Sequence, residues 1–96
     1  MQIDSNISGD NLSITIRNHI TGISEVAQIK TLIDSHRNIR NIDLNIIDAY
    51  VIPSMLIGYL VKLIKKDKKS ITINCSKKEL KQLIKDLNLD TIITIR

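Results

Sequence analysis

The sequence predicts one α/β domain, residues 1–96, with a mixed sheet, an N-terminal β-hairpin and helices mainly on one face. Two segments that alternate apolar and polar residues flank a turn near the N-terminus, which is the pattern of a hairpin. Three helix-like segments then alternate with strands, which predicts parallel crossovers. The strands themselves alternate, whereas a parallel sheet covered on both faces is apolar throughout. We therefore expect a single-layer sandwich of order ββαβαβαβ, with one face left more polar.

The first two strands are expected at residues 1–7 and 11–17, on either side of the turn sequence Ser-Gly-Asp-Asn. The second strand directs three aliphatic residues to one face, namely Leu12, Ile14 and Ile16. Residues 23–36 predict the first helix, because apolar residues recur there at helical spacing.

The central part of the chain predicts a strand, a helix and a further strand. Apolar and polar residues alternate again in residues 40–47, which indicates the third strand. Residues 54–67 predict the second helix. The proline before them biases the residue that precedes it away from helix, so the helix is expected to begin after the proline. Residues 70–75, Ser-Ile-Thr-Ile-Asn-Cys, predict the fourth strand.

The third helix has the clearest start signal in the chain. Ser76 and Glu79 form an S-x-x-E capping box, and leucine and isoleucine residues follow at i, i+3, i+4 and i+7. Residues 91–95, Thr-Ile-Ile-Thr-Ile, predict a final strand.

The composition indicates an aliphatic core and a reducing compartment. Hydrophobic residues make up 43% of the chain, with no Trp, no Phe and two Tyr. The single cysteine, Cys75, excludes an internal disulfide and is typical of cytoplasmic proteins. The longest apolar stretch, around residues 51–64, is interrupted by polar residues and is too short to span a bilayer. We expect a cytoplasmic protein.

Residues that could carry catalysis or bind a metal ion are sparse and poorly placed. His19 and His36 have no Cys, Asp or Glu at a ligand spacing, and Cys75 has no paired histidine. The three glycines are scattered, so they form neither a phosphate loop nor a dinucleotide fingerprint. Asp43 and Asp48 are an odd number of residues apart and face opposite sides of a strand. We predict no enzyme, no cofactor and no metal site.

Positive charge is concentrated in the second half of the chain. The formal net charge is +4, but residues 49–96 carry ten basic and four acidic side chains, against four and six in residues 1–48. Such an excess can attract nucleic acid or acidic membrane lipid. It can equally be the solvated face of two helices, since neither interleaved aromatic residues nor a helix-turn-helix pattern accompanies the lysines.

The order of elements and several short motifs resemble the STAS domain, the fold of anti-sigma-factor antagonists and of regulatory domains in some transporters. The resemblance covers nearly the whole chain. The matching residues are the D-L pair of the third strand and the closing leucines of the third helix, namely Asp43, Leu44, Leu83, Leu87 and Leu89. The family begins its second helix with Asp-Ser-Ser-Gly-Leu, which falls here on residues 53–57 and keeps the first serine, Ser54. In the family a partner kinase phosphorylates that serine, so the resemblance implies a phosphorylation site at Ser54.

Two interpretations of Ser54 stay open from the residues alone. Directly after Pro53, a serine is well placed as the N-cap of the helix, which contributes about 1 kcal/mol. The same position offers free N–H groups and the positive end of the helix dipole to a phosphate. A phosphate there would add nearly two negative charges to an apolar surface, which disrupts an interface.

The second helix is apolar over an arc about twice as wide as the roughly 100° that one covered face needs. Neighbouring helices can cover the surplus, or it can remain exposed as a docking patch. With the preceding loop, residues 50–53, the start of this helix is the expected contact surface. We expect the following residues to contact a partner: Tyr50, Pro53, Ser54, Met55, Leu56, Gly58, Tyr59 and Lys62.

We therefore expect a non-enzymatic protein that regulates another protein by binding it. The resemblance implies an anti-sigma-factor antagonist, whose bacterial partner is an anti-sigma factor or serine kinase in a partner-switching circuit. Two alternatives are the small STAS subunit of an ABC lipid-transport complex, bound to its ATPase, and a basic protein that binds nucleic acid or a membrane surface. A homodimer through the same apolar helix is a further option.

Overall fold

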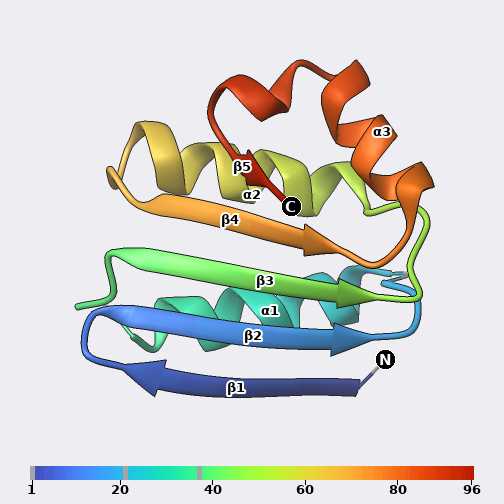
Figure 1. The fold of residues 1–96 in the computed structure, drawn as a ribbon. Helices are drawn as coiled ribbons and strands as arrows, with labels where there is room; N and C mark the ends of the chain where they lie inside the picture. The colour runs from blue at the N-terminus through green and yellow to red at the C-terminus, as the bar shows by residue number, and fades with distance from the viewer. Residues whose placement is uncertain (1, 21, 37) are drawn as a thin grey trace.

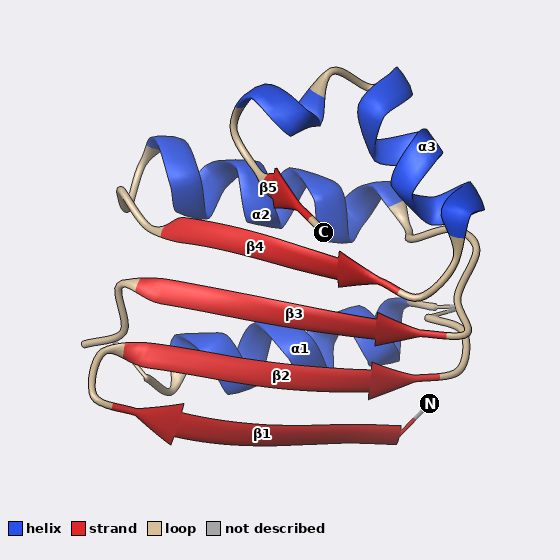
Figure 2. Ribbon diagram, in the orientation of Figure 1, coloured by secondary structure: helices blue, strands red, loops and turns tan. Residues whose placement is uncertain are grey.

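The computed structural model describes residues 2–20, 22–36 and 38–96, which form one five-stranded sheet covered by helices (Figures 1 and 2). The α/β class, the N-terminal hairpin and the mixed sheet are confirmed: β1 is antiparallel to β2, and the other neighbouring strands are parallel. In chain order the elements are β1 (Gln2–Ser8), β2 (Asn11–Arg17), α1 (Ile23–Asp34), β3 (Asn41–Ile47), α2 (Ser54–Lys65), β4 (Ser70–Cys75), α3 (Lys78–Asp86), the 3₁₀ helix η1 (Leu89–Thr91) and β5 (Thr94–Ile95).

A two-residue turn closes the hairpin of β1 and β2. Ser8 faces Asn11 across the turn, so only Gly9 and Asp10 connect the strands. Gly9 has a φ of 62°, a left-handed conformation that glycine adopts without steric cost. Glycine at the first of two turn positions is typical of the hairpin turns whose twist matches that of the strands.

The strand order, β1-β2-β3-β4-β5, never reverses direction. Parallel crossovers are right-handed, so crossovers that always step the same way place their helices on the same face. Figure 1 shows this arrangement: α1 and α2 lie behind the sheet, and α3 lies near β4. The expectation of helices mainly on one face therefore follows from the topology.

The core lies between the sheet and the helices and is aliphatic, as the composition predicts. Alternate residues of the three central strands are buried, namely Leu12, Ile14, Ile16, Ile42, Leu44, Ile46, Ile71 and Ile73. The helices cover them with Val26, Ile29, Ile33, Leu56, Leu60, Leu63, Leu80 and Ile84. At about 25 cal/mol per Å² of apolar area, burial of these side chains is the main force that holds the helices on the sheet.

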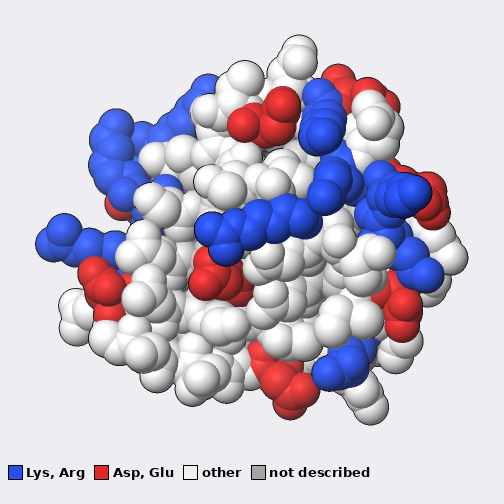
Figure 3. All heavy atoms as spheres, viewed as in Figure 1, with Lys and Arg blue, Asp and Glu red and all other residues white. Residues whose placement is uncertain are grey.

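The opposite face of the sheet is polar and carries a row of hydrogen-bonded side chains. The Asn45 amide donates to Ser13 Oγ at 3.3 Å and to Thr15 Oγ1 at 3.4 Å. Asn74 in turn donates from Nδ2 to Asn45 Oδ1 at 2.7 Å, which links β2, β3 and β4. This face points toward the viewer in Figure 3, where one basic side chain crosses the middle of the view and the other lysines and arginines lie toward its margins.

The capping box predicted for α3 is wrong. The helix begins at Lys78 with Lys77 as its N-cap residue. The Ser76 hydroxyl instead accepts a hydrogen bond from the Asp48 N–H at 2.9 Å. A contact with the loop after β3 has thus replaced a local contact within the helix.

The final strand is shorter than predicted. Asn88 ends α3 with a φ of 58°, and the chain then forms η1 before it reaches the sheet. The Ile93 N–H donates to the Leu89 carbonyl at 2.8 Å, which keeps residues 91–93 in a tight turn. Ile93 is nevertheless buried. The apolar residues that predicted a strand over residues 91–95 therefore include one that anchors this turn to the core.

Leu44→Ala should lower the free energy of unfolding by about 2–5 kcal/mol, because it leaves a cavity in the fully buried centre of the sheet. Leu87→Ala removes the same atoms from a side chain that is 48% exposed and should cost well under 1 kcal/mol. Urea unfolding followed by far-UV circular dichroism measures both values. Similar losses in the two variants would contradict the assignment of the core.

Candidate functional site

The carboxyl ends of β2, β3 and β4 meet at one edge of the sheet, where the loops to the helices begin. Asn18 and Asp48 follow their strands with φ of 71° and 67°, a left-handed conformation that Asn and Asp tolerate. The Asn18 N–H donates to the Ile47 carbonyl at 3.1 Å, and Ser76 accepts from Asp48 as described above. These hydrogen bonds hold the three loops next to one another.

Large apolar side chains are exposed at this same edge. Ile23, at the start of α1, is 72% exposed, and Met55, at the start of α2, is 54% exposed. Tyr50 and Val51, in the loop between β3 and α2, are 43% and 59% exposed. Both helices start here because each crossover helix runs antiparallel to the strands. We call Ile23, Tyr50, Val51 and Met55 the apolar rim.

Polar groups surround the ring of Tyr50. The His19 ring lies 6.0 Å from it, centroid to centroid, in a stacked orientation. The Lys77 ammonium is 5.5 Å from the ring centroid, and it also lies 3.8 Å from the Asp48 carboxylate. An aromatic ring held by a histidine and a lysine presents a defined apolar surface with polar margins, as the contact residues of protein interfaces do.

Ser54 is the first residue of α2, and its side chain is exposed. The interpretation of Ser54 as N-cap is wrong, because Pro53 occupies that position with extended backbone, φ −64° and ψ 146°. The Pro53 carbonyl accepts the first helical hydrogen bonds, from the N–H groups of Leu56 and Ile57. The hydroxyl of Ser54 therefore lies in the first helical turn, next to Met55 of the apolar rim.

The other residues expected to contact a partner divide into a surface group and a core group. Gly58 and Lys62 are exposed on the same side of α2 as Ser54, and Pro53 is half-buried. Leu56 is completely buried, so its side chain belongs to the core and the expectation for it is corrected. The wide apolar arc of α2 is thus explained mostly by packing, and Met55 is the large apolar residue of the helix that remains exposed.

Tyr59 faces α1 and joins the two helices. Its hydroxyl donates to Asp34 Oδ1 at 2.6 Å, and the Lys30 ammonium lies 5.3 Å from its ring centroid. Burial raises the pKa of Tyr59 above its ordinary value of 10.0, and the hydrogen bond to the Asp34 carboxylate raises it further. Its ring is half-buried in this contact, so Tyr59 contributes to helix packing more than to the exposed surface.

Sequence reasoning missed Ile23, His19 and Lys77 as parts of this edge. Ile23 lies off the apolar face of its helix, which is the signal that could have found it. His19 and Lys77 approach Tyr50 only through the fold, because they are distant from it in the sequence.

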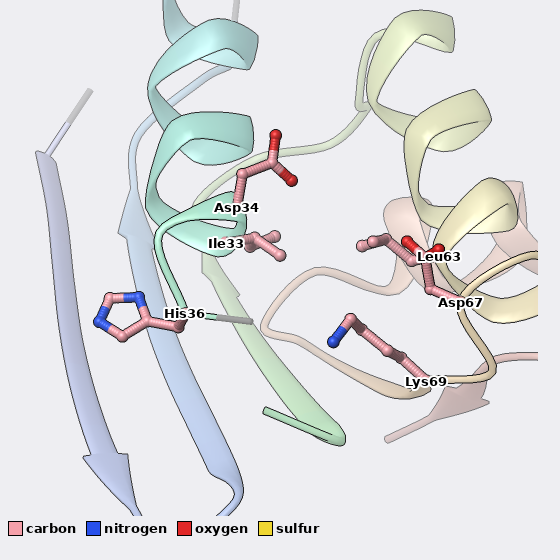
Figure 4. A pocket seen from close by; sticks show the side chains of 6 residues that line it. All are labelled: Ile33, Asp34, His36, Leu63, Asp67 and Lys69. Carbon is pink, nitrogen blue, oxygen red and sulfur yellow. The ribbon is translucent and has the colours of Figure 1, made fainter. Parts of the chain in front are cut away.

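A polar groove of about 470 Å³ lies at the opposite end, between the ends of α1 and α2 (Figure 4). Asp34, Asp67 and Lys69 line it, so its charges are of both signs. The Lys69 ammonium donates to the Ile39 carbonyl at 2.5 Å, and His36 donates from Nδ1 to the Leu32 carbonyl at 2.8 Å. In Figure 4 the His36 ring points away from the other labelled side chains, so the groove does not assemble a set of converging polar groups.

The thiol of Cys75 is half-buried at the end of β4 and packs against the core. Burial raises its pKa above the usual value, and the positive charge of Lys81 offsets part of that effect. A raised pKa disfavours the thiolate, which is the nucleophilic form. Within residues 2–20, 22–36 and 38–96, no group of three or more His, Cys, Asp or Glu is placed to hold a metal ion.

Neither a scan against protein-family models nor a search of the curated proteins finds a match to this sequence. Among the residues that the structure describes, no helix is both long enough and apolar enough to cross a bilayer. The hairpin, the mixed sheet and the helices are compatible with a STAS-like architecture.

Tyr59→Phe should lower the free energy of unfolding by about 1 kcal/mol at neutral pH, because it removes the hydrogen bond to Asp34. The unfolded chain loses the tyrosine proton at lower pH than the folded protein, so this contribution falls as the pH rises above 10. Urea unfolding of both proteins at increasing pH measures the difference, with Tyr50→Phe as the control for a lost hydroxyl. A difference that stays constant above pH 10 would contradict the raised pKa.

Proposed function

We propose that this protein acts by binding another protein through the apolar rim and the adjacent exposed side of α2, as a STAS-like anti-sigma-factor antagonist does. The observation that carries the proposal is the exposure of Tyr50, Val51 and Met55 around the start of α2, with exposed Ile23 at the start of α1 on the same edge of the sheet. Exposed apolar side chains that occur singly need no explanation, whereas a group of them beside polar margins is typical of interaction surfaces.

The rim residues are suited to a protein interface by their chemistry. Met adapts its shape to a partner, and Tyr combines an apolar ring with a polar tip. Complete burial of a Val, Ile or Met side chain contributes about 1.5–3 kcal/mol, so a few such residues can dominate an interface. Lys77 at the rim and Lys78 at the start of α3 place positive charge beside it. A partner surface with an apolar centre and an acidic margin fits this arrangement.

Ser54 supports the regulatory part of the proposal. Its exposed hydroxyl adjoins Met55, so a phosphate on it would introduce about −1.5 to −2 charges directly beside the contact surface. The start of α2 tolerates a phosphate in the unbound protein, because its N–H groups and dipole favour negative charge. Phosphorylation at Ser54 therefore opposes binding without opposing folding. By its resemblance to the family, the partner is a serine kinase or an anti-sigma factor.

Met55→Asp should abolish retention of the partner when the purified protein is used as bait in a lysate of its source organism. The substitution places an uncompensated charge in the centre of the interface and should weaken binding by at least about tenfold. Leu87→Asp is the matched control, because Leu87 is 48% exposed on another surface and its substitution should leave binding unchanged. Mass spectrometry identifies the retained protein, and calorimetry with that protein in purified form measures the Kd.

The Ser54 variants separate the switch from simple docking. Ser54→Asp should weaken binding as phosphorylation does, whereas Ser54→Ala should bind like wild type. Equal binding by both variants to the ATPase of a transporter would replace the switch by a permanent subunit contact. Binding that survives Met55→Asp but falls steeply with salt would contradict the rim and favour a nucleic-acid or membrane-surface binder that uses the lysines.

A further inference from the structure

The outer edge of β1 is a long and regular strand edge. β1 pairs with β2 over seven residues in continuous register and is the last strand on its side of the sheet. Natural edge strands are usually protected by charged side chains, above all lysine, by proline, by a bulge or by short length. The opposite edge, β5, is protected by its length of two residues. β1, with the sequence Gln-Ile-Asp-Ser-Asn-Ile-Ser, has no lysine, proline or bulge and is seven residues long, and Asp4 is its one charged side chain.

The hydrogen-bond pattern of the sheet identifies the peptide groups that point outward from β1. The Asn18 N–H donates to β3, and the Asp10 carbonyl accepts from the Asn41 N–H, so the even-numbered residues of β2 bond to β3. The odd-numbered residues of β2 therefore bond to β1, where their facing partners are the even-numbered residues of that strand. The N–H and C=O groups of Ile3, Ser5 and Ile7 consequently point to the open edge.

These outward residues are arranged symmetrically around Ser5. In an antiparallel pair centred on Ser5, Ile3 of one copy faces Ile7 of the other, and Asp4 faces Asn6. The two isoleucine pairs then contribute apolar contact, and each carboxylate is opposite an amide that can donate to it. We propose that β1 pairs in this register with β1 of a second copy of the chain, so that one continuous sheet crosses a two-fold axis at Ser5.

Other self-pairing registers are less favourable. A pair centred on Asp4 places two carboxylates directly opposite each other, which is destabilising. A pair centred on Asn6 sets Ile7 opposite Ser5 and leaves Gln2 and Ile3 without a partner residue in the strand. Of these three registers, only the one centred on Ser5 gives every residue of β1 a partner in the second copy of the strand. The contact is isologous, because the same surface is used by both copies.

Two side chains on the helix side of β1 are exposed, as expected if a second strand covers them in the dimer. Residues of β1 that face the helix layer include Ile7, which is 45% exposed, and Ser5, which is exposed. A groove of about 660 Å³ runs between Ile3 and the outer side of α1, where Ala27 and Leu32 line it. Facing residues in a sheet point to the same side, so pairing of the two β1 strands would bring the isoleucines of both copies together beside this groove.

Sedimentation velocity over a range of protein concentrations tests the proposal with the protein at full length. We expect a reversible dimer with a Kd on the order of 10–100 µM, because an edge-strand contact is at the small end of specific interfaces. Ile7→Lys should weaken it at least tenfold, since a lysine on the edge opposes pairing. Leu87→Lys makes the same change at a site of similar exposure, 48%, and should leave the dimer intact.

Ser5→Pro removes the central outward N–H and should also prevent dimerisation. The hydrogen bonds of β1 to β2 use the even-numbered residues, so circular dichroism should remain that of the wild type. Met55→Asp should leave the dimer unchanged, which distinguishes this contact from self-association through α2. The dimer inference and the proposed function can therefore fail independently.

Cross-linking tests the register, in a Cys75→Ala background that removes the native thiol. Ser5→Cys places two thiols opposite each other at a Cα separation of about 5.5 Å, and a short bifunctional maleimide should join them. Ile7→Cys places the two thiols about 14 Å apart along the strands, so it should not cross-link. A wild-type protein that stays monomeric at all concentrations, or equal cross-linking of both variants, would overturn the proposal.

Discussion

The arrangement of this protein depends on one topological constraint: after the hairpin, every parallel strand is added on the same side of the previous one. Right-handed crossovers that step in a constant direction cannot place helices on both faces. The sheet therefore has a buried side and an exposed side, and its strands must alternate in polarity. The same constraint brings the starts of α1 and α2 to one edge, which is why Ile23 and Met55 share a surface although they are distant in the sequence.

The exposed side of the sheet shows how a single-layer fold avoids a second apolar face. Its hydrogen-bonded row across β2, β3 and β4 uses short polar side chains, which bond to one another as well as to water. Such a face offers little apolar area for association, so contacts are expected instead at the helices, the loops and the edges of the sheet. The apolar rim and the open edge of β1 are two such places, at different positions on the molecule.

Much of the fold could be predicted because alternation and helical spacing are imposed by burial on one side only. The bounds of β2 and β4 coincide with the predicted ranges for this reason. Two predictions failed because a residue contacts a distant part of the chain. Ser76 accepts a hydrogen bond from Asp48 and does not cap α3, and Ile93 is buried in the core although it does not belong to a strand. For the site, the sequence indicated Tyr50 and Met55, but it could not show that Leu56 is fully buried or that Ile23 lies at the same edge. Those facts depend on which helices are neighbours, and no pattern within one segment contains that information.

The aliphatic core also determines how this molecule can be observed. Without Trp or Phe, its near-ultraviolet absorption comes from Tyr50 and Tyr59. One ring lies at the apolar rim beside His19, and the other lies between α1 and α2 beneath Lys30. The sheet and its buried leucines and isoleucines are optically silent in that range. Intrinsic tyrosine signals therefore report on the apolar rim and on the contact between α1 and α2. They do not report directly on the packing of the aliphatic core.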